Sequence, residues 1–201
     1  GVSSHTAMPQ KGRVALLGAA EVINSVHHFI PRRIDPTEMV AIGIGYIEGG
    51  SKLGTVANKT VMEGSIRATS KQTLDFVMDR IRDTVEGVSR ILDLGNEVSI
   101  EGVYPPVLND AALNDTVTSA ATSLLGADKV IPQPKCPGTS EDFSIFGEHV
   151  PLFYLKLGVA NDAKGIRFPL HSDCFEVDER SLAVGVSVLA GSVLAFLGEG
   201  D

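Results

Sequence analysis

Apolar residues recur at two different spacings in the first third of the chain. Over residues 13–30 they recur every three or four positions, which predicts a helix with one apolar face. A residue that precedes proline avoids helical backbone angles, so this helix is expected to end before Pro31. Residues 38–47 instead alternate between apolar and small side chains, which is the period of a half-buried strand. A turn rich in glycine follows, and a second strand is predicted over residues 55–68.

The next elements complete a known order of helices and strands. Ser70 is a residue type that caps helix N-termini, and apolar residues recur at helical spacing from there to Gly95, a typical helix C-terminus. Residues 98–103 alternate again, and a short strand is expected near residues 2–8. The order is then β-α-β-β-α-β, the ferredoxin-like arrangement, in which a four-stranded antiparallel sheet carries both helices on one face. The sequence therefore predicts an α+β fold whose first domain spans residues 1–107.

The pattern changes after the first domain. A helix is predicted over residues 110–125 and a short strand over residues 129–131. After a proline-rich stretch, Ser140 is expected to cap a short helix that has acidic residues in its first turn. The apolar run from Leu152 to Leu157 is typical of a strand buried on both faces, as in parallel sheets.

The last predicted element is a long apolar helix that ends at Leu197. Asp178 or Ser181 is expected to cap it, and its composition predicts that it is buried. Residues 108–201 would thus form the C-terminal part of an α/β domain, with sheet edges that need partners.

Composition excludes several classes of protein. The chain has 201 residues with 25 acidic and 17 basic side chains, a net charge of −8. A field of that sign repels phosphate backbones, so no nucleic-acid partner is expected. No uninterrupted apolar run reaches the ~20 residues of a membrane span, so no membrane partner is expected either. The two cysteines exclude a disulfide scaffold and fit a reducing compartment, which predicts a cytoplasmic protein. The chain starts at Gly1 without the pattern of a signal peptide, and we expect a fragment or a processed product.

Three side chains are candidates for chemistry. His5 has small neighbours that leave its imidazole accessible, and His171 follows an apolar strand in a loop with acidic neighbours. Arg67 ends the second strand on its polar face, where a guanidinium can hold a carboxylate in a two-pronged contact. From spacing alone, an ordinary hydrogen-bonded histidine is favoured at positions 5 and 171, and a solvated arginine at position 67 is as well supported as one that binds a carboxylate.

Five separated motifs make the chain resemble a known family. The chain resembles the co-catalytic metallopeptidase family of aminoacylases, glutamate carboxypeptidases, hippurate hydrolases and auxin-conjugate amidohydrolases, most closely the branch that cleaves N-acyl amino acids. The motifs that carry this resemblance occur in the order Gly1–Pro9, Met62–Arg67, Tyr104–Asp110, Gly138–Phe143 and Pro169–Ser172. The resemblance implies a ferredoxin-like lid and dimerisation domain followed by the C-terminal part of a catalytic domain. It also implies that the first half of the enzyme, with most metal ligands, is absent from this chain.

The resemblance also implies roles for the three candidates. His171 matches the histidine that completes the metal site, and the metal is expected to be zinc, with manganese or cobalt as alternatives. His5 matches the lid histidine that reaches the scissile carbonyl oxygen, often across a homodimer. Arg67 matches the arginine that binds the substrate's free carboxylate. An N-acyl amino acid is therefore the expected small-molecule substrate.

Two positions depart from the family's pattern. Gln10 follows Pro9 where the family usually has histidine, and Gly54 stands where it commonly has asparagine. The sequence predicts the C-terminal portion of a metal-dependent amidohydrolase, inactive as an isolated chain because one histidine cannot hold a catalytic metal. The alternative is a dimerisation or interaction module derived from that family, without enzymatic activity.

Overall fold

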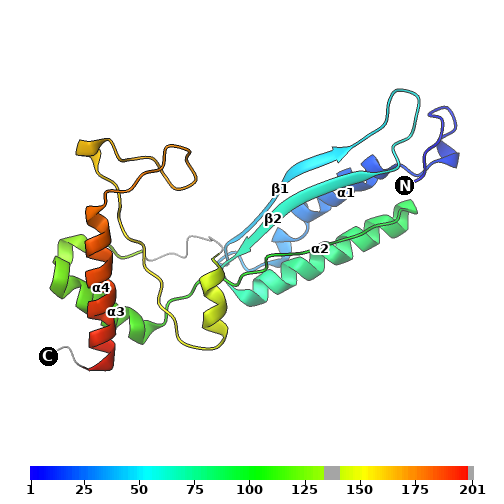
Figure 1. Ribbon diagram of the computed structural model, residues 1–201. Coiled ribbons are helices and arrows are strands. Elements are labelled where there is room, and N and C mark those ends of the chain that lie inside the picture. Colours follow the sequence, from blue (N-terminus) through cyan, green and yellow to red (C-terminus); the bar gives the residue numbers. More distant parts are fainter. Residues whose placement is uncertain (134–140, 199–201) are drawn as a thin grey trace. The chain divides into compact units, whose positions relative to one another are not determined.

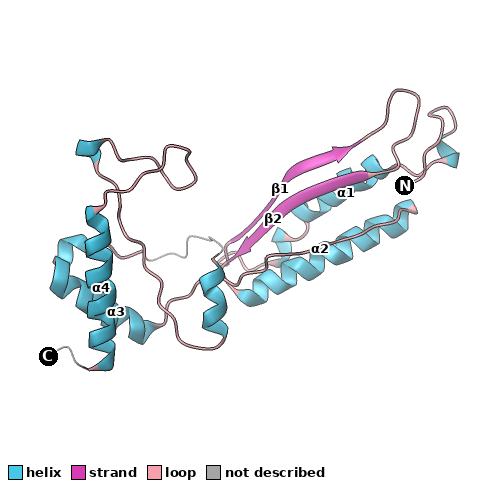
Figure 2. Ribbon diagram, in the orientation of Figure 1, coloured by secondary structure: helices cyan, strands magenta, loops and turns pink. Residues whose placement is uncertain are grey.

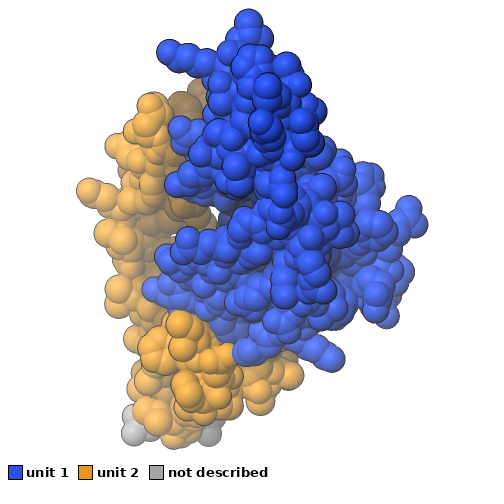
Figure 3. Space-filling view, turned by 90° about the vertical axis from the view of Figure 1, so that its right-hand side faces the viewer, with its two compact units in different colours: residues 1–106, 136–142 blue, residues 107–135, 143–201 orange. Residues whose placement is uncertain are grey.

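The computed structural model describes residues 1–133 and 141–198. The chain forms two compact units, coloured separately in Figure 3. Unit 1 comprises Gly1–Pro106 together with Glu141 and Asp142, and unit 2 comprises the other described residues. The expected cap Ser140 lies outside the described residues.

The chain has a mixed α/β content, shown in Figures 1 and 2. Its helices and strands are α1 (Ala15–His28), β1 (Val40–Gly49), β2 (Thr60–Ala68), α2 (Lys71–Leu92), α3 (Ala111–Leu125) and α4 (Arg180–Leu197). Short 3-10 turns are η1 (Pro9–Lys11), η2 (Pro31–Arg33), η3 (Ala127–Lys129), η4 (Asp142–Glu148) and η5 (Asp162–Lys164).

Unit 1 is built on an antiparallel ribbon of two strands with two helices beside it (Figure 1). Ala41 of β1 faces Arg67 of β2, and a bulge shifts the register between Ile44 and Tyr46. Both helices pack on one face of the ribbon, because alternate strand residues point to that face. The core cluster consists of Val22, Val26, Ile30 and Val77, packed against Val40, Ile42, Met62 and Ile66 of the strands.

The predicted start of α2 is confirmed, but its end differs. The Ser70 hydroxyl accepts a hydrogen bond from the Thr73 backbone N–H at 3.1 Å, as an N-cap does. The left-handed residue that ends the helix is Asp93, with φ of 54°, and not the expected Gly95. Arg13 binds the Asp93 carboxylate at 2.6 Å and thereby contacts the C-terminal end of this helix.

The expected four-stranded sheet is reduced to two strands among the described residues. In place of a strand near residues 2–8, Val2 and His5 make isolated bridges, to Arg13 and Thr55. Residues 98–103 are not a strand, although Val98 and Ile100 are half-buried and Ser99 between them is exposed. Alternation thus indicates the partial burial of Val98 and Ile100 but not the exposure of Val103. A strand also needs a backbone neighbour to form its ladder.

Unit 2 packs α3 against α4 through small residues. A Cβ on Gly191 would lie 2.7 Å from the Leu124 side chain of α3, and one on Gly185 would lie 3.0 Å from Leu157. Because glycine has no side chain, both leucines can reach the backbone of α4. The helix predicted over residues 110–125 is therefore confirmed by α3, and Asp110 caps it by accepting from the Leu113 N–H at 3.0 Å.

The two strands predicted in unit 2 do not form. Residues 129–131 end the 3-10 turn η3 and continue irregularly. Residues 152–157 carry no strand assignment, and no ladder is present in the described part of unit 2. Their burial alternates, with Phe153 and Leu155 half-buried and Tyr154 exposed, whereas a strand buried on both faces was expected.

Helix α4 forms where predicted but is largely exposed. Ser181 and Val188 are its buried residues, so the expectation of a buried helix is wrong. Its N-cap is Glu179, which makes no side-chain cap bond, in place of Asp178 or Ser181. By length and composition alone, α4 could cross a membrane. Its apolar composition therefore predicts helix formation but not what covers the helix.

Candidate functional site

His5 is held by backbone contacts on both sides. Its neighbours in sequence make backbone hydrogen bonds to Gly54 (3.0 Å) and Val56 (2.9 Å), just before β2. The Ala7 backbone N–H donates to Nδ1 of His5 at 3.0 Å. A neutral imidazole that accepts at Nδ1 carries its proton on Nε2. His5 is exposed, so this Nε2–H can donate to a carbonyl oxygen from outside the unit.

Gly54, which contacts the segment of His5, has a backbone conformation that favours glycine. Its φ is +91°, a conformation that L side chains rarely adopt, and a Cβ there would meet nothing within 4 Å. The departure from asparagine at this position therefore coincides with a backbone conformation that favours glycine, although the space around it would admit a side chain.

Arg67 lies near the end of β2 on the ribbon face turned away from the helices. It is exposed, and the next residue, Ala68, is buried. The alternation of the strand explains this, since Ile66 and Ala68 belong to the core side. A shallow concavity on the ribbon lies over the bulge and is lined by Tyr46 and Glu63 among others, but not by Arg67.

His5 and Arg67 lie at opposite ends of unit 1. His5 pairs with Thr55, which precedes β2, whereas Arg67 is the penultimate residue of that strand. A strand advances about 3.3 Å per residue, so the seven steps from Thr60 to Arg67 span roughly 23 Å. A single copy of unit 1 therefore does not bring both side chains to one small molecule.

His171 lies in unit 2, in a turn with an unusual backbone. The Ser172 N–H donates to the Pro169 carbonyl oxygen at 3.2 Å, which makes His171 the third residue of a four-residue turn. Its φ is 70°, as a type II turn requires at this position, where glycine is the usual residue. Among described residues other than glycine, Asp93 and His171 alone have positive φ. The imidazole is exposed.

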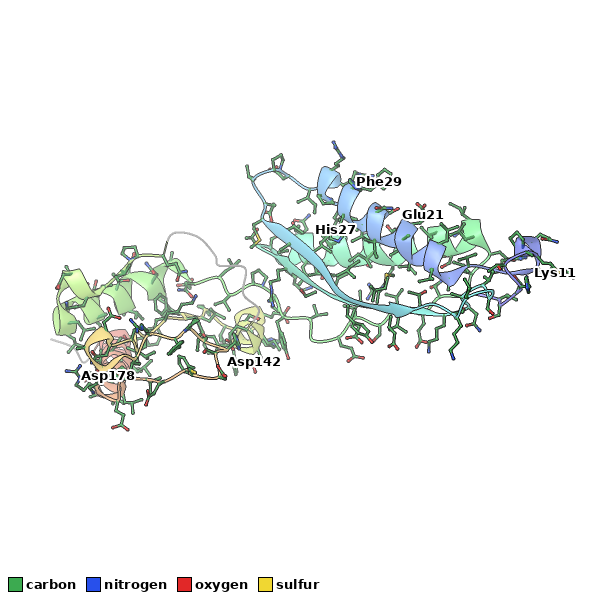
Figure 4. All side chains as sticks on the ribbon, turned by 90° about the horizontal axis from the view of Figure 1, so that it is seen from above. Lys11, Glu21, His27, Phe29, Asp142 and Asp178 are labelled. Atoms are coloured by element: carbon green, nitrogen blue, oxygen red, sulfur yellow. The ribbon has the colours of Figure 1, made fainter. Side chains whose placement is uncertain are left out.

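Asp178 holds together the two ends of the loop that carries His171, through hydrogen bonds and ion pairs. Its carboxylate is 7% exposed and accepts from Arg180 Nη2 at 2.6 Å, from Lys164 Nζ at 3.0 Å and from the side-chain amide of Asn161. Hydrogen bonds from Arg180, Asn161 and Lys164 hold the pKa of Asp178 well below its usual range. Figure 4 labels this residue near the start of α4.

The backbone closes the same loop. The Asp178 N–H donates to the carbonyl oxygen of Val159 at 2.9 Å, and Asn161 pairs with Ile166 in an isolated bridge. Residues 160–177 thus form a surface loop whose two ends are held together by these bonds. His171 depends on these bonds for its position, because η5 is the one short helical turn within the loop.

Asn109 holds the extended segment after residue 151. Its side-chain amide donates to the Tyr154 carbonyl oxygen at 3.0 Å and accepts from the Tyr154 N–H at 2.8 Å. The Asp110 N–H adds a bond to the Leu152 carbonyl oxygen at 2.9 Å. Asn109 therefore pairs with this segment in the way a neighbouring strand would.

The described residues do not assemble a metal centre by themselves. No group of three or more His, Cys, Asp or Glu side chains that could hold a metal ion occurs in residues 1–133 and 141–198. His171 alone fits the chemistry of one ligand, an exposed imidazole on a loop. The three candidates are thus dispersed over two units, with His5 and Arg67 in unit 1 and His171 in unit 2.

Asp178 and Asn109 are supporting residues whose roles spacing does not indicate. The sequence indicates Asp178 as a helix cap or as an acidic neighbour of the His171 loop, and Asn109 as part of a motif. Three side chains that bind Asp178 lie within 17 residues of it in the sequence: Asn161, Lys164 and Arg180. Their types could have suggested partners for a carboxylate, but only the folded loop brings them together.

Comparison with known sequences finds relatives among amide hydrolases. An N-acetyldiaminopimelate deacetylase of Oenococcus oeni is 30% identical over 198 residues, which cover 97% of this chain and 50% of that protein. An IAA-amino acid hydrolase of Arabidopsis thaliana is 27% identical over 201 residues, covering 98% of this chain and 46% of that protein. The chain spans about half the length of the curated relatives it matches.

Solved structures share the fold. An aminohydrolase from methicillin-resistant Staphylococcus aureus superposes with a TM-score of 0.78 at 21% identity, over 98% of this chain and 50% of that one. A dinuclear metal-binding peptidase of Bacillus subtilis superposes with a TM-score of 0.69 at 19% identity, over 92% and 47%. The model of peptidase family M20/M25/M40 matches residues 11–195. The chain therefore belongs to this family of hydrolases.

Proposed function

We propose that this chain supplies the lid and the C-terminal part of a metal-dependent amidohydrolase that cleaves N-acyl amino acids or small peptides. Family membership supports amide hydrolysis, and the two curated relatives named above act on N-acyl or amino-acid conjugates by their names. Unit 1 is proposed as a ferredoxin-like lid and dimerisation domain, and unit 2 as part of the catalytic domain.

One observation carries the proposal: the hydrogen bond from the Ala7 N–H to Nδ1 of His5. It leaves Nε2–H as a fixed donor on an exposed ring, which is the arrangement needed to stabilise negative charge on the carbonyl oxygen of a scissile amide.

His171 is proposed to contribute one imidazole to a divalent metal, with zinc expected and manganese or cobalt as alternatives. When bound, such a metal polarises the amide carbonyl and lowers the pKa of a bound water. His171 keeps a left-handed backbone conformation in which most side chains are strained by about 1 kcal/mol or more. A histidine at this position fits a side chain that is needed for binding.

Arg67 is proposed to bind the substrate's carboxylate, which requires a homodimer. The roughly 23 Å between the ends of β2 keeps His5 and Arg67 of one copy from acting on one small substrate. If both act on the same amide, they come from different copies. We therefore propose that unit 1 pairs through its helices or its strand edge.

The rival function is a dimerisation module without enzymatic activity. The observation in its favour is that the residues described here form no metal cluster of three or more ligands. The two functions differ in one respect, because the hydrolase needs additional polypeptide that carries the other metal ligands, whereas the module does not.

Hydrolysis assays with and without a complementing segment test the proposal. We define this segment as the part of the Oenococcus oeni deacetylase that the chain does not match. The chain alone with Zn²⁺, Mn²⁺ or Co²⁺ is expected to release no amino acid from N-acetyl amino acids, and the chain combined with the segment is expected to do so. Turnover by the chain alone, or none in the combination, contradicts the proposal.

Single substitutions then separate the three roles in the combined protein. His5→Ala is expected to lower kcat about 10²- to 10³-fold, since one oxyanion donor is lost. Arg67→Ala is expected to raise KM for an N-acetyl amino acid but not for its methyl ester. His171→Ala is expected to weaken metal binding in a titration without substrate. His149→Ala, at another exposed histidine of unit 2, is the matched control and is expected to change none of these quantities.

A further inference from the structure

Asp178 is a buried carboxylate to which the proposed hydrolysis gives no role. It is the one charged residue among the buried residues of the part of the chain that the structure describes. Burial of a carboxylate costs free energy unless the group is paired and hydrogen-bonded, so aspartate is seldom buried without such partners. The partners of Asp178 therefore indicate what the carboxylate holds in place.

These partners come from both sides of the loop that precedes α4. Asn161 and Lys164 lie on the segment that enters the loop, and their side chains donate to the Asp178 carboxylate. Arg180 is the first residue of α4, which follows the loop, and it donates to the same carboxylate from Nε and Nη2. One carboxylate thus connects the start of the loop to the start of the helix.

The turn of His171 lies in the middle of the segment that is fixed in this way. The Asn161 backbone pairs with that of Ile166 through bonds of 2.7 and 3.0 Å, and Ile166 is buried. His171 follows Ile166 by five residues and precedes Asp178 by seven. The bond from the Ser172 N–H to the carbonyl oxygen of Pro169 closes the turn itself, but a local bond does not fix a turn relative to the rest of the unit. The anchors on both sides do so.

Asp178 is poorly suited to bind a metal ion by itself. Its Oδ1 accepts from Lys164 Nζ at 3.0 Å, and its Oδ2 accepts from Arg180 Nη2 at 2.6 Å and from the Asn161 amide. Two cations therefore neutralise the carboxylate already, and a divalent metal would have to displace them from both oxygens. A role in metal binding would have to be exerted through another residue.

We propose that Asp178 is a positioning residue, which holds the loop so that the imidazole of His171 is fixed where it binds the metal. This inference rests on the proposed function, because the proposed function makes His171 a metal ligand. A loop that is ordered before binding spares the metal the entropy cost of ordering it. Residues that orient a metal ligand without touching the metal change its affinity about 10- to 100-fold. Asp178 acts through several residues of backbone, so we expect an effect of about tenfold.

Titration of the combined protein with Co²⁺ in the absence of substrate tests this role. The combined protein is the full chain together with the complementing segment defined above. Asp178→Asn is expected to raise the Kd for Co²⁺ about tenfold, and Lys164→Met, a milder change at an exposed position, about two- to threefold. Asp173→Asn is the matched control. It removes an exposed carboxylate two residues from His171 and is expected to change the Kd less than about twofold.

Two further variants separate positioning from a general loss of stability. If Asp178 acts through His171, then Asp178→Asn in a chain that already carries His171→Ala is expected to weaken Co²⁺ binding no further. Val77→Ala removes two methyl groups from the core of unit 1 and is expected to leave the Kd as in the parent protein. A role of Asp178 in stability alone would not distinguish between these backgrounds.

The possible outcomes distinguish this inference from the proposed function. The inference is overturned if Asp178→Asn binds Co²⁺ as the parent does, if Asp173→Asn weakens binding equally, or if the substitutions at Asp178 and His171 have additive effects. A combined protein that binds no Co²⁺ contradicts both the inference and the proposed function. Binding that depends on Asp178, in a protein that hydrolyses no N-acetyl amino acid, contradicts the proposed function and leaves this inference standing.

Discussion

The two units of the chain use apolar side chains in opposite ways. In unit 1, Val26 and Val77 are essentially inaccessible, and the two helices and the ribbon close around them. In unit 2, valine and leucine side chains of α4 are mostly exposed. Hydrogen bonds and ion pairs of Asp178 and Asn109 hold its loop and its extended segment in place. Unit 1 therefore has the core of a self-supporting domain, and unit 2 has the organisation of a partner that packs against further polypeptide.

The largest expected effect compares the same substitution in two helices. Val77→Ala is expected to lower the free energy of unfolding of unit 1 by about 2–3 kcal/mol, because two buried methyl groups are lost and a cavity remains. Val186→Ala, at an exposed position of α4, is expected to stay within about 0.5 kcal/mol of the parent. Urea unfolding followed by circular dichroism measures both. Equal losses for the two variants would mean that α4 is as well packed as α2.

Asp178→Asn is expected to have the next largest effect, confined to unit 2. The variant keeps the shape but weakens the bonds to Arg180 and Lys164, so amides in residues 160–177 are expected to exchange hydrogen about tenfold faster or more. Asp173→Asn, which changes an exposed carboxylate of the same loop, is the control. Hydrogen exchange followed by mass spectrometry reads both. A response that spreads to α1 and α2 would contradict a role of Asp178 confined to its own loop.

The same carboxylate predicts a dependence on pH. The pKa of Asp178 is lower in the folded chain than in an unfolded chain, where it is about 3.9. Its contribution to stability is therefore complete above about pH 4 and decreases as the pH falls below the unfolded value. In the parent chain, the amides of residues 160–177 are expected to lose the protection that Asp178 provides as the pH falls. In Asp178→Asn, their protection is expected to show no such dependence on pH.

Asn109→Ala tests the side-chain hydrogen bonds that take the place of a strand ladder beside residues 152–157. The variant removes two hydrogen bonds to the Tyr154 backbone, which is expected to destabilise this segment by about 1–2 kcal/mol. Exchange of the amides at residues 152–156 measures the change. Ser99→Ala, which removes a side-chain hydrogen bond in unit 1, is expected to leave that segment as it is in the parent chain. Protection that survives in Asn109→Ala would show that another contact orders the segment.

The smallest expected change in stability is at His171. His171→Gly relieves a left-handed conformation but adds chain entropy to the unfolded state, so the two effects are expected to cancel within about 1 kcal/mol. His171→Ala keeps the strain and is expected to be less stable than the glycine variant. Thermal unfolding of the two variants ranks them. An alanine variant more stable than the glycine variant would contradict the role given to φ at this residue.

The helices could be predicted because their signals are local. Apolar spacing located α1, α2, α3 and α4, and Ser70 marked the start of α2 by its own side-chain chemistry. The missing strands could not be predicted in the same way. Alternation at Val98 and Ile100 indicates their partial burial, but a strand depends on a neighbouring strand that the local sequence does not reveal.

The sequence nominates candidate residues for a site, but it does not give their arrangement. His5, Arg67 and His171 were found by their chemistry and by resemblance, whereas the tautomer of His5 depends on a bond to the Ala7 backbone that spacing does not reveal. The exposure of α4 was missed for a related reason. An apolar composition shows that a surface avoids water, but not which polypeptide covers it.

Hydrogen exchange of α4 with and without the complementing segment tests the central contrast most directly. In the chain alone, the account predicts that amides of α4 exchange faster than those of α2 around Val77, and that adding the segment slows exchange in α4 while α2 is unchanged. Contradiction would come from α4 amides as protected as those of α2 in the chain alone, with no change when the segment is added.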